Sequence, residues 1–274
     1  IGEYGTLMLR HDSGLLGISG SVNADRFIVT SGIGSVPGQV PVTNNMVDPW
    51  ITSRSENQFL KYDAVLGFQT ITQGGAPANY ISSTAATLDG SVLPLNDGTE
   101  ILDATANPAT LGMNLDVYAL RTSRNINNSA DNVFRKITIR SGGIIAAVNT
   151  DVLNPDLYFG PSVNSVDGSN AGEALIWANT GALSVNGKLY ASQVTKSGTN
   201  ALNILADQPQ FTGNWVINGG VVQFQTPGAQ STGEVILNAA HMVDSDSVFN
   251  LTEVRYNFNS GTPVTLLDGM MMSY

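Results

Sequence analysis

Three short β-type runs, each interrupted by a glycine turn, recur along this chain at an even interval. The runs are 136–145, 174–185 and 214–224. Their turn glycines, Gly143, Gly181 and Gly219, are separated by 38 residues in both intervals. A fixed period of this size is typical of stacked units that are too small to bury their apolar faces alone. The period corresponds to two coils of about 19 residues, so the sequence predicts an all-β solenoid, with an all-β sandwich as the alternative.

The remaining sequence also favours short strands divided by Gly and Asn turns, and no window predicts an amphipathic helix longer than about ten residues. The expected strands are 6–9, 15–18, 26–30, 59–62, 64–71, 115–120, 134–139, 157–159, 174–177, 202–205, 215–217, 221–224, 234–237, 251–258 and 264–267. Two stretches rich in turn residues, 33–58 and 73–108, are expected to form protruding loops. We therefore divide the chain into a β-rich region with protruding loops, 1–110, and regular β-helix repeats, 111–274, within one continuous solenoid.

Composition narrows the choice of partners and location. Charged residues make up 12% of the chain and hydrophobic residues 42%, which predicts an uncharged β surface over a sizeable core. The net charge of −10 and the absence of a basic stripe argue against nucleic acid as a partner. Cysteine is absent, which is typical of chains exported across an oxidising bacterial envelope.

The chain contains no apolar stretch near the roughly 20 residues that span a bilayer, so we expect no membrane insertion by this segment. It begins at Ile1, without an initiator Met and without a charged-then-apolar leader. We interpret it as a processed form or as a fragment of a longer chain.

The most regular stretch resembles a known repeat. The segments Thr195–Leu205, Phe211–Trp215 and Val216–Phe224 follow one another in the order Lys-x-Gly-x-x-x-Leu, Phe-Thr-Gly and strand-Asn-Gly-Gly-strand. This order is similar to the autotransporter-associated β-strand repeat of bacterial autotransporter passenger proteins, although Asn200 stands at the usual second glycine. The resemblance extends over roughly 111–240 and is thin elsewhere.

The resemblance implies a right-handed parallel β-helix exported to the bacterial cell surface. We accordingly expect a non-enzymatic extracellular protein with a structural or adhesive role, either a passenger segment or a fibre subunit. Its expected partners are copies of itself, neighbouring β-helix segments, and cell-surface or matrix glycans. The protruding loops of the first third are the expected sites of recognition. We expect no catalytic residue, no cofactor and no metal ligand.

Two other functions stay open. Parallel β-helices include polysaccharide lyases and hydrolases, and hydrolysis requires paired carboxylates. Asn149-Thr-Asp151 is the one fragment of a polygalacturonase-like motif set, and we expect Asp151 to stabilise a turn instead. The second alternative is a self-assembling filament or sheath subunit.

The remaining candidate sites concern metal ions and aromatic rings. Asp244 and Asp246, with His241 and Glu253 nearby, form the densest acidic group, for which a solvated turn is expected and calcium binding is the alternative. Trp177 and Trp215 lie inside strand runs and are expected in the core, whereas Trp50 follows Pro49 in an irregular stretch and is the better candidate for a surface ring.

Overall fold

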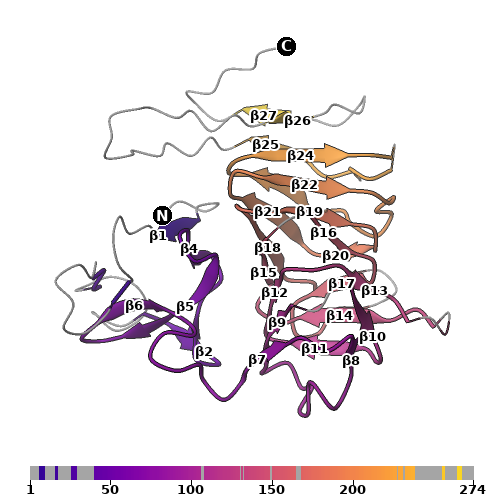
Figure 1. The fold of residues 1–274 in the computed structure, drawn as a ribbon. Helices are drawn as coiled ribbons and strands as arrows, with labels where there is room; N and C mark the ends of the chain where they lie inside the picture. The colour runs from indigo at the N-terminus through magenta and orange to yellow at the C-terminus, as the bar shows by residue number, and fades with distance from the viewer. Residues whose placement is uncertain are drawn as a thin grey trace.

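The computed structural model describes residues 6–9, 16–17, 26–29, 40–105, 108–129, 131, 133–148, 150–164, 168–226, 228–230, 232–237, 255–256 and 264–266. Throughout these residues the fold is all-β, as predicted, and contains no helix. A parallel β-solenoid of about seven turns spans residues 80–237, and an N-terminal unit lies beside it (Figure 1). The described segments accordingly contain no helix that could cross a membrane.

Three parallel sheets form the walls of the solenoid. The nine-stranded sheet contains β7 (Tyr80–Ser83), β9 (Ile101–Ala104), β12 (Ala119–Thr122), β15 (Gly143–Ala146), β18 (Glu173–Ala178), β21 (Gln193–Ser197), β23 (Asn214–Ile217), β25 (Val235–Leu237) and β27 (Val264–Leu266). The eight-stranded sheet contains β8 (Thr87–Leu88), β10 (Ala109–Leu111), β13 (Ile126–Asn127), β16 (Thr150–Leu153), β19 (Ala182–Val185), β22 (Ala201–Ile204), β24 (Val221–Phe224) and β26 (Arg255–Tyr256). The short solenoid sheet contains β11 (Leu115–Val117), β14 (Lys136–Ile139), β17 (Asp156–Phe159) and β20 (Leu189–Tyr190). The first coil starts at β7, so the solenoid begins ahead of residue 111.

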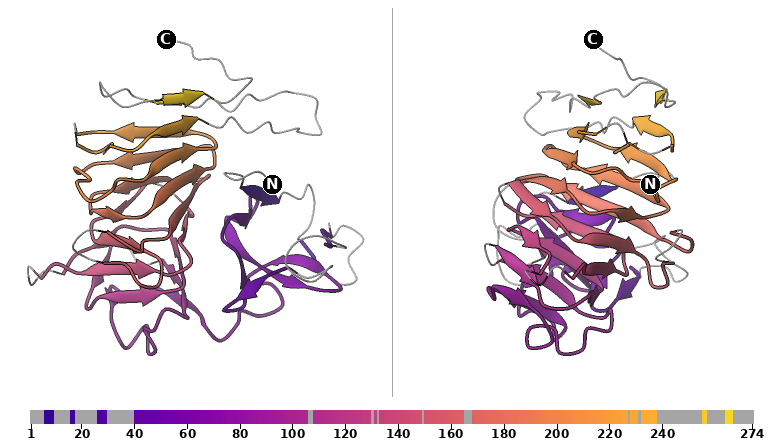
Figure 2. Two further views of the ribbon diagram at one scale, coloured as in Figure 1. Left: turned by 180° about the vertical axis from the view of Figure 1, so that it is seen from behind. Right: turned by 90° about the vertical axis from the view of Figure 1, so that its right-hand side faces the viewer.

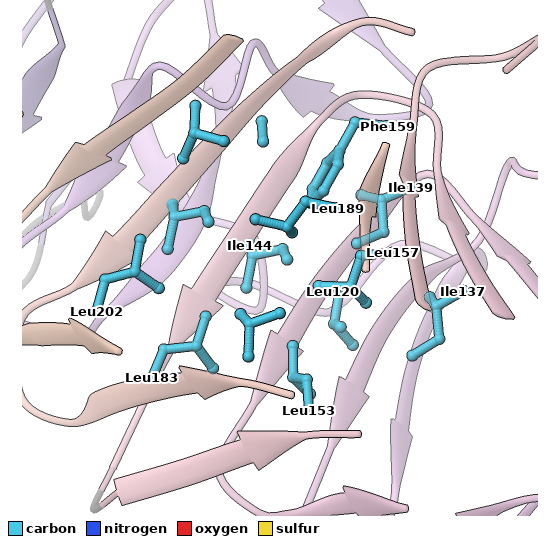
Figure 3. Close-up of a cluster of buried hydrophobic side chains, with 14 of the residues drawn as sticks. Leu120, Ile137, Ile139, Ile144, Leu153, Leu157, Phe159, Leu183, Leu189 and Leu202 are labelled. Carbon is cyan, nitrogen blue, oxygen red and sulfur yellow. The ribbon is translucent and has the colours of Figure 1, made fainter. Parts of the chain in front are cut away.

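The core consists of aliphatic columns that run along the solenoid axis. On the nine-stranded sheet Leu120 pairs with Ile144, and Ile144 pairs with Ile176, so equivalent positions of successive coils stack inside. Leu183 and Leu202 form a similar column on the eight-stranded sheet, and Figure 3 shows these side chains converging between the sheets. Because strand side chains alternate between the two faces, every second residue of each strand enters this core.

Coil length agrees with the prediction in the C-terminal half of the solenoid. Glu173 pairs with Gln193 and Gln193 pairs with Asn214, so these coils are 20 and 21 residues long. Two of the three evenly spaced glycines, Gly181 and Gly219, lie at equivalent corners between the nine-stranded and eight-stranded sheets. Gly143 does not share their position, because it is the first residue of β15 and follows the corner that leaves the short sheet.

The N-terminal unit is a half-barrel sheet with the strand order β1-β4-β5-β6 and a small hairpin, β2-β3 (Figure 2). Its strands are β1 (Leu7–Leu9), β2 (Val42–Thr43), β3 (Met46–Val47), β4 (Ile51–Ser53), β5 (Gln58–Asp63) and β6 (Gly67–Thr70). Its own small core contains Leu16, Val47, Ile51, Leu60 and Phe68.

The turn-rich stretches differ most from the structure that the sequence predicted for them. The stretch 33–58 was expected to be a loop, yet its described part, 40–58, contains β2, β3 and β4. The hairpin turn between β2 and β3 uses the left-handed conformation at Asn44 and Asn45, so these asparagines form a tight turn and not a long loop. Similarly, 73–108 contains β7, β8 and β9.

Two expected strands near the N-terminus are also wrong in their described parts. Residues 26–29 are not a strand, although the carbonyl of Phe27 accepts a hydrogen bond from the amide of Phe68. Residues 16–17 form a turn in the middle of the expected strand 15–18.

Candidate functional site

The outer face of the nine-stranded sheet carries an apolar stripe that the N-terminal unit covers. Ile101, Ala119, Ile145 and Trp177 lie on this outer face, and Met46, Phe59 and Ile71 of the N-terminal unit pack against them. In Figures 1 and 2 the N-terminal unit lies along this side of the solenoid. We call the combined surface the clasp interface.

A glycine creates the space that the clasp interface needs. A Cβ atom on Gly143 would lie 2.5 Å from Pro49 Cβ and 3.1 Å from Phe59 Cε1. Beside this notch, Trp177 Nε1 donates a 2.9 Å hydrogen bond to the carbonyl oxygen of Pro49. The side chain of Trp177 is 4% exposed, so its indole N–H is satisfied by the N-terminal unit and not by water.

A charged network closes one end of the clasp interface. Arg121 Nη1 contacts both carboxylate oxygens of Asp103, at 2.8 and 2.9 Å, and Arg121 Nε donates to the carbonyl of Asn57 at 2.9 Å. Tyr80 donates its hydroxyl proton to Asp103 Oδ2 at 2.7 Å. Burial, followed by the nearby charge of Asp103, raises the pKa of Tyr80 above its ordinary value. Tyr80, Asp103 and Arg121 thus pair with one another on the solenoid, and the hydrogen bond from Arg121 to Asn57 connects this network to the N-terminal unit.

Asn57 connects the N-terminal unit to a solenoid corner. It adopts a positive φ of 47° at the turn before β5, and its side chain reaches the carbonyl of Ala147. The side chains of Asn179 and Thr180 contact Asn57 as well. Farther along the solenoid, the hydroxyls of Thr6 and Ser197 form a 2.8 Å hydrogen bond, so the clasp interface also includes β21.

Asp151, the one candidate acid of a hydrolase motif, points into the solenoid core. It lies on β16, where it pairs with Leu183, and it is 1% exposed, so the expected turn role is wrong. Its Oδ2 atom has no hydrogen-bond partner. Burial raises the pKa of Asp151 to about 7, and the charge of Arg124 opposes this shift. A carboxyl enclosed among leucines cannot reach a polysaccharide.

Lys196 is another buried ionisable residue, and in the sequence it stands at the first position of the repeat motif. It is 0% exposed on β21, and its Nζ atom contacts three backbone carbonyl oxygens. Burial lowers the pKa of Lys196 to about 7. The signal in the sequence was its position: it occupies an inward, aliphatic position of an alternating strand.

The tryptophans behave largely as predicted. Trp215 is 0% exposed in the solenoid core, where it packs edge-on against Phe211 and Phe224. Trp177 is buried too, but on the outer face of the nine-stranded sheet, beneath the N-terminal unit. Trp50, the candidate for a surface ring, is partly buried against the small core of the N-terminal unit.

The aromatic rings on the short solenoid sheet are not available for stacking on sugars. Tyr158 and Tyr190 stack with a centroid distance of 4.1 Å and an interplanar angle of 11°, and each is 5% exposed. Lys136 Nζ lies 4.5 Å from the centroid of Tyr158.

One exposed ring was not expected from the sequence. Phe134 is 87% exposed and its neighbour Val133 is 50% exposed, in the protruding segment between β13 and β14. The sequence predicted Phe134 as the start of a strand, whereas β14 begins at Lys136. The run that precedes it, 127–132, is rich in Asn and Asp, and this composition is the signal that could have indicated a loop.

The expected acidic group around Asp244 and Asp246 lies outside the described residues. Among the residues that are described, no three His, Asp or Glu side chains lie close enough together to hold a metal ion. Within the described residues, the clasp interface is therefore occupied by the chain itself, and Phe134, beside Val133, is the most exposed of the large apolar side chains.

The comparisons with known proteins do not add a family to this description: no protein-family model, no curated protein and no solved structure matches the chain.

Proposed function

We propose that this chain is a non-enzymatic structural scaffold of the autotransporter-passenger type, carried at the bacterial cell surface. The observation that carries the proposal is where its buried ionisable groups lie. Asp103 pairs with Arg121 on the solenoid, and Arg121 also donates to the carbonyl of Asn57 on the N-terminal unit, while Asp151 and Lys196 are enclosed within the solenoid. These groups pair within the fold or are enclosed by it, which supports a scaffold over an enzyme.

The placement of the repeat motif also supports this proposal. The segment 195–224 supplies β21 to β24, that is, two strands on each of the two long sheets. The motif thus builds coils, and recognition is left to segments that project from them.

The projecting tip Val133-Phe134 is the contact that we assign to adhesion. A phenylalanine that is 87% exposed leaves apolar surface whose burial against a partner would be favourable. Asp131 and Arg135 form an ion pair that flanks the tip, which limits the freedom of its backbone. The tip therefore suits an apolar hollow rimmed by polar groups on a cell-surface or matrix partner.

Binding of the labelled chain to bacterial and host cell surfaces tests the proposal. Phe134→Ser is expected to lower binding by about tenfold with no loss of thermal stability, because the ring has little contact with the fold. Val65→Ser is the matched control, since Val65 is 70% exposed on the N-terminal unit. Equal binding by wild type and Phe134→Ser would remove the tip from the proposal.

The enzyme alternative is tested on the same preparation. Release of reducing or unsaturated sugars from acidic polysaccharides would replace the scaffold proposal with a polysaccharide hydrolase or lyase. Electron microscopy of the purified chain distinguishes a single rod from a filament or sheath subunit.

A further inference from the structure

Lys196 interrupts an otherwise aliphatic column inside the solenoid. Its inward neighbours are Ile176 on the preceding coil and Ile217 on the following coil. The same column contains Ile81, Leu102, Leu120, Ile144, Ile176, Lys196, Ile217 and Leu237. A lysine in such a column is unfavourable unless its charged end finds compensating partners.

The partners are three carbonyl oxygens that belong to two successive corners. Lys196 Nζ donates to the carbonyls of Gly198 at 2.6 Å and Asn200 at 2.5 Å, both in the corner that follows β21. It also donates to the carbonyl of Gly219 at 2.8 Å, in the equivalent corner one coil later. An ammonium group has three N–H donors, and here each has an acceptor.

The backbone of the second corner is shaped around this ammonium group. Gly220 has a φ of +72°, and a Cβ atom there would lie 2.5 Å from Lys196 Nζ and 2.6 Å from the carbonyl oxygens of Gly198 and Asn200. Glycine thus provides both the left-handed turn and the space that brings the corners together. Burial favours the neutral amine, whereas three carbonyl dipoles directed at one nitrogen favour the cation.

We propose that the carbonyl oxygens of Gly198, Asn200 and Gly219 form a binding site for a primary ammonium group, which the chain fills with Lys196. The ammonium group ties the corners of two successive coils to each other and thereby fixes their register. This inference is independent of the proposed function, because it concerns the interior of the solenoid.

The site can be emptied and refilled from solution. Lys196→Ala removes the side chain beyond Cβ, and n-propylammonium supplies the missing three carbons and nitrogen. We expect n-propylammonium to raise the Tm of Lys196→Ala saturably, by about 2–4 °C, because it binds the folded state alone. Neither wild type nor the exposed-lysine control Lys188→Ala is expected to respond.

Two further reagents separate an ammonium site from a simple cavity. n-Propanol has the same apolar length but no charge, and tetramethylammonium has the charge but no N–H donor. A response to n-propylammonium alone supports the site. Equal responses to n-propylammonium and n-propanol would overturn it, because filling the cavity would then be enough to raise the Tm. The absence of any response to n-propylammonium would overturn it as well.

The test also works if Lys196→Ala does not fold in buffer alone. The variant is then diluted from urea into each reagent, and the recovery of β-sheet circular dichroism is measured. Recovery in n-propylammonium but not in n-propanol supports the site, and equal recovery in both contradicts it. Lys196→Met serves as a second variant: its aliphatic side chain fills the column, so its Tm is expected to be insensitive to n-propylammonium.

Discussion

At the scale of single residues, the solenoid contains a carboxyl group in a place where its charge is unfavourable. Asp151 pairs with Leu183 of the next coil in an inward column, and its Oδ2 atom has no hydrogen-bond partner. Burial raises the pKa of Asp151 to about 7. An unfolded aspartate has a pKa near 3.9. Between these two values the folded chain holds a proton that the unfolded chain has released. The contribution of Asp151 to stability is therefore complete below about pH 4 and is lost as the pH rises through about 7.

We therefore predict that Asp151→Asn is more stable than wild type at pH 8, by about 2–4 kcal/mol, and similar to wild type at pH 4. Urea unfolding at both pH values measures the difference. Burial lowers the pKa of Lys196 to about 7, so the titration of Lys196 affects stability above that pH. It does so in both proteins, and the difference between them therefore reports on Asp151. An equal difference between the two proteins at both pH values would show that Asp151 does not titrate in this way.

At the scale of elements, the clasp interface depends on how closely β15 approaches the N-terminal unit. Gly143 begins β15, and its φ lies outside the left-handed region, so its backbone accepts any residue. The obstacle to a side chain is the proximity of Pro49 and Phe59. A substitution there should therefore displace the N-terminal unit without unfolding the coils.

Gly143→Ala is accordingly expected to increase the rate of limited proteolysis in the segment 73–78, which connects the two units, by about fivefold or more. The solenoid should keep its circular dichroism. Gly90→Ala is the matched control, because the nearest atom to a Cβ there is Met113 Sδ at 4.0 Å. Unchanged cleavage of Gly143→Ala would mean that the interface tolerates the added methyl group.

The same elements show which parts of the fold the sequence could predict. Alternating apolar residues and corner glycines identified the coils around β18 to β24, because there local pattern and tertiary position agree. The inward direction of Asp151 could not be predicted, since a shift of one residue in register reverses the face of every side chain. The clasp interface depends on contacts such as Trp177 with Pro49, far apart in sequence, and no local pattern encodes them. Likewise, the Pro- and Asn-rich stretch 40–58 resembled a loop, although its turns connect real strands.

At the scale of the whole molecule, two kinds of packing coexist. The solenoid stacks each coil on the next, so its stability is approximately a sum of coil and neighbour contributions. The N-terminal unit instead covers the side of several coils, from Ile101 on β9 to Ser197 on β21. It shields an apolar stripe that a bare solenoid would expose.

A chain that starts at residue 76 is therefore expected to keep most of the strand content of the solenoid but to associate at lower concentrations than the full chain. Exposed apolar stripes of this kind drive association in water. Sedimentation velocity over a range of concentrations measures the effect. The double substitution Ile145→Thr and Trp177→Ser in the shortened chain is the control, because it makes the stripe polar, and it should restore the sedimentation of the full chain. If the shortened chain sediments as the full chain does, the stripe is not adhesive by itself, and the N-terminal unit would have to act by some means other than shielding it.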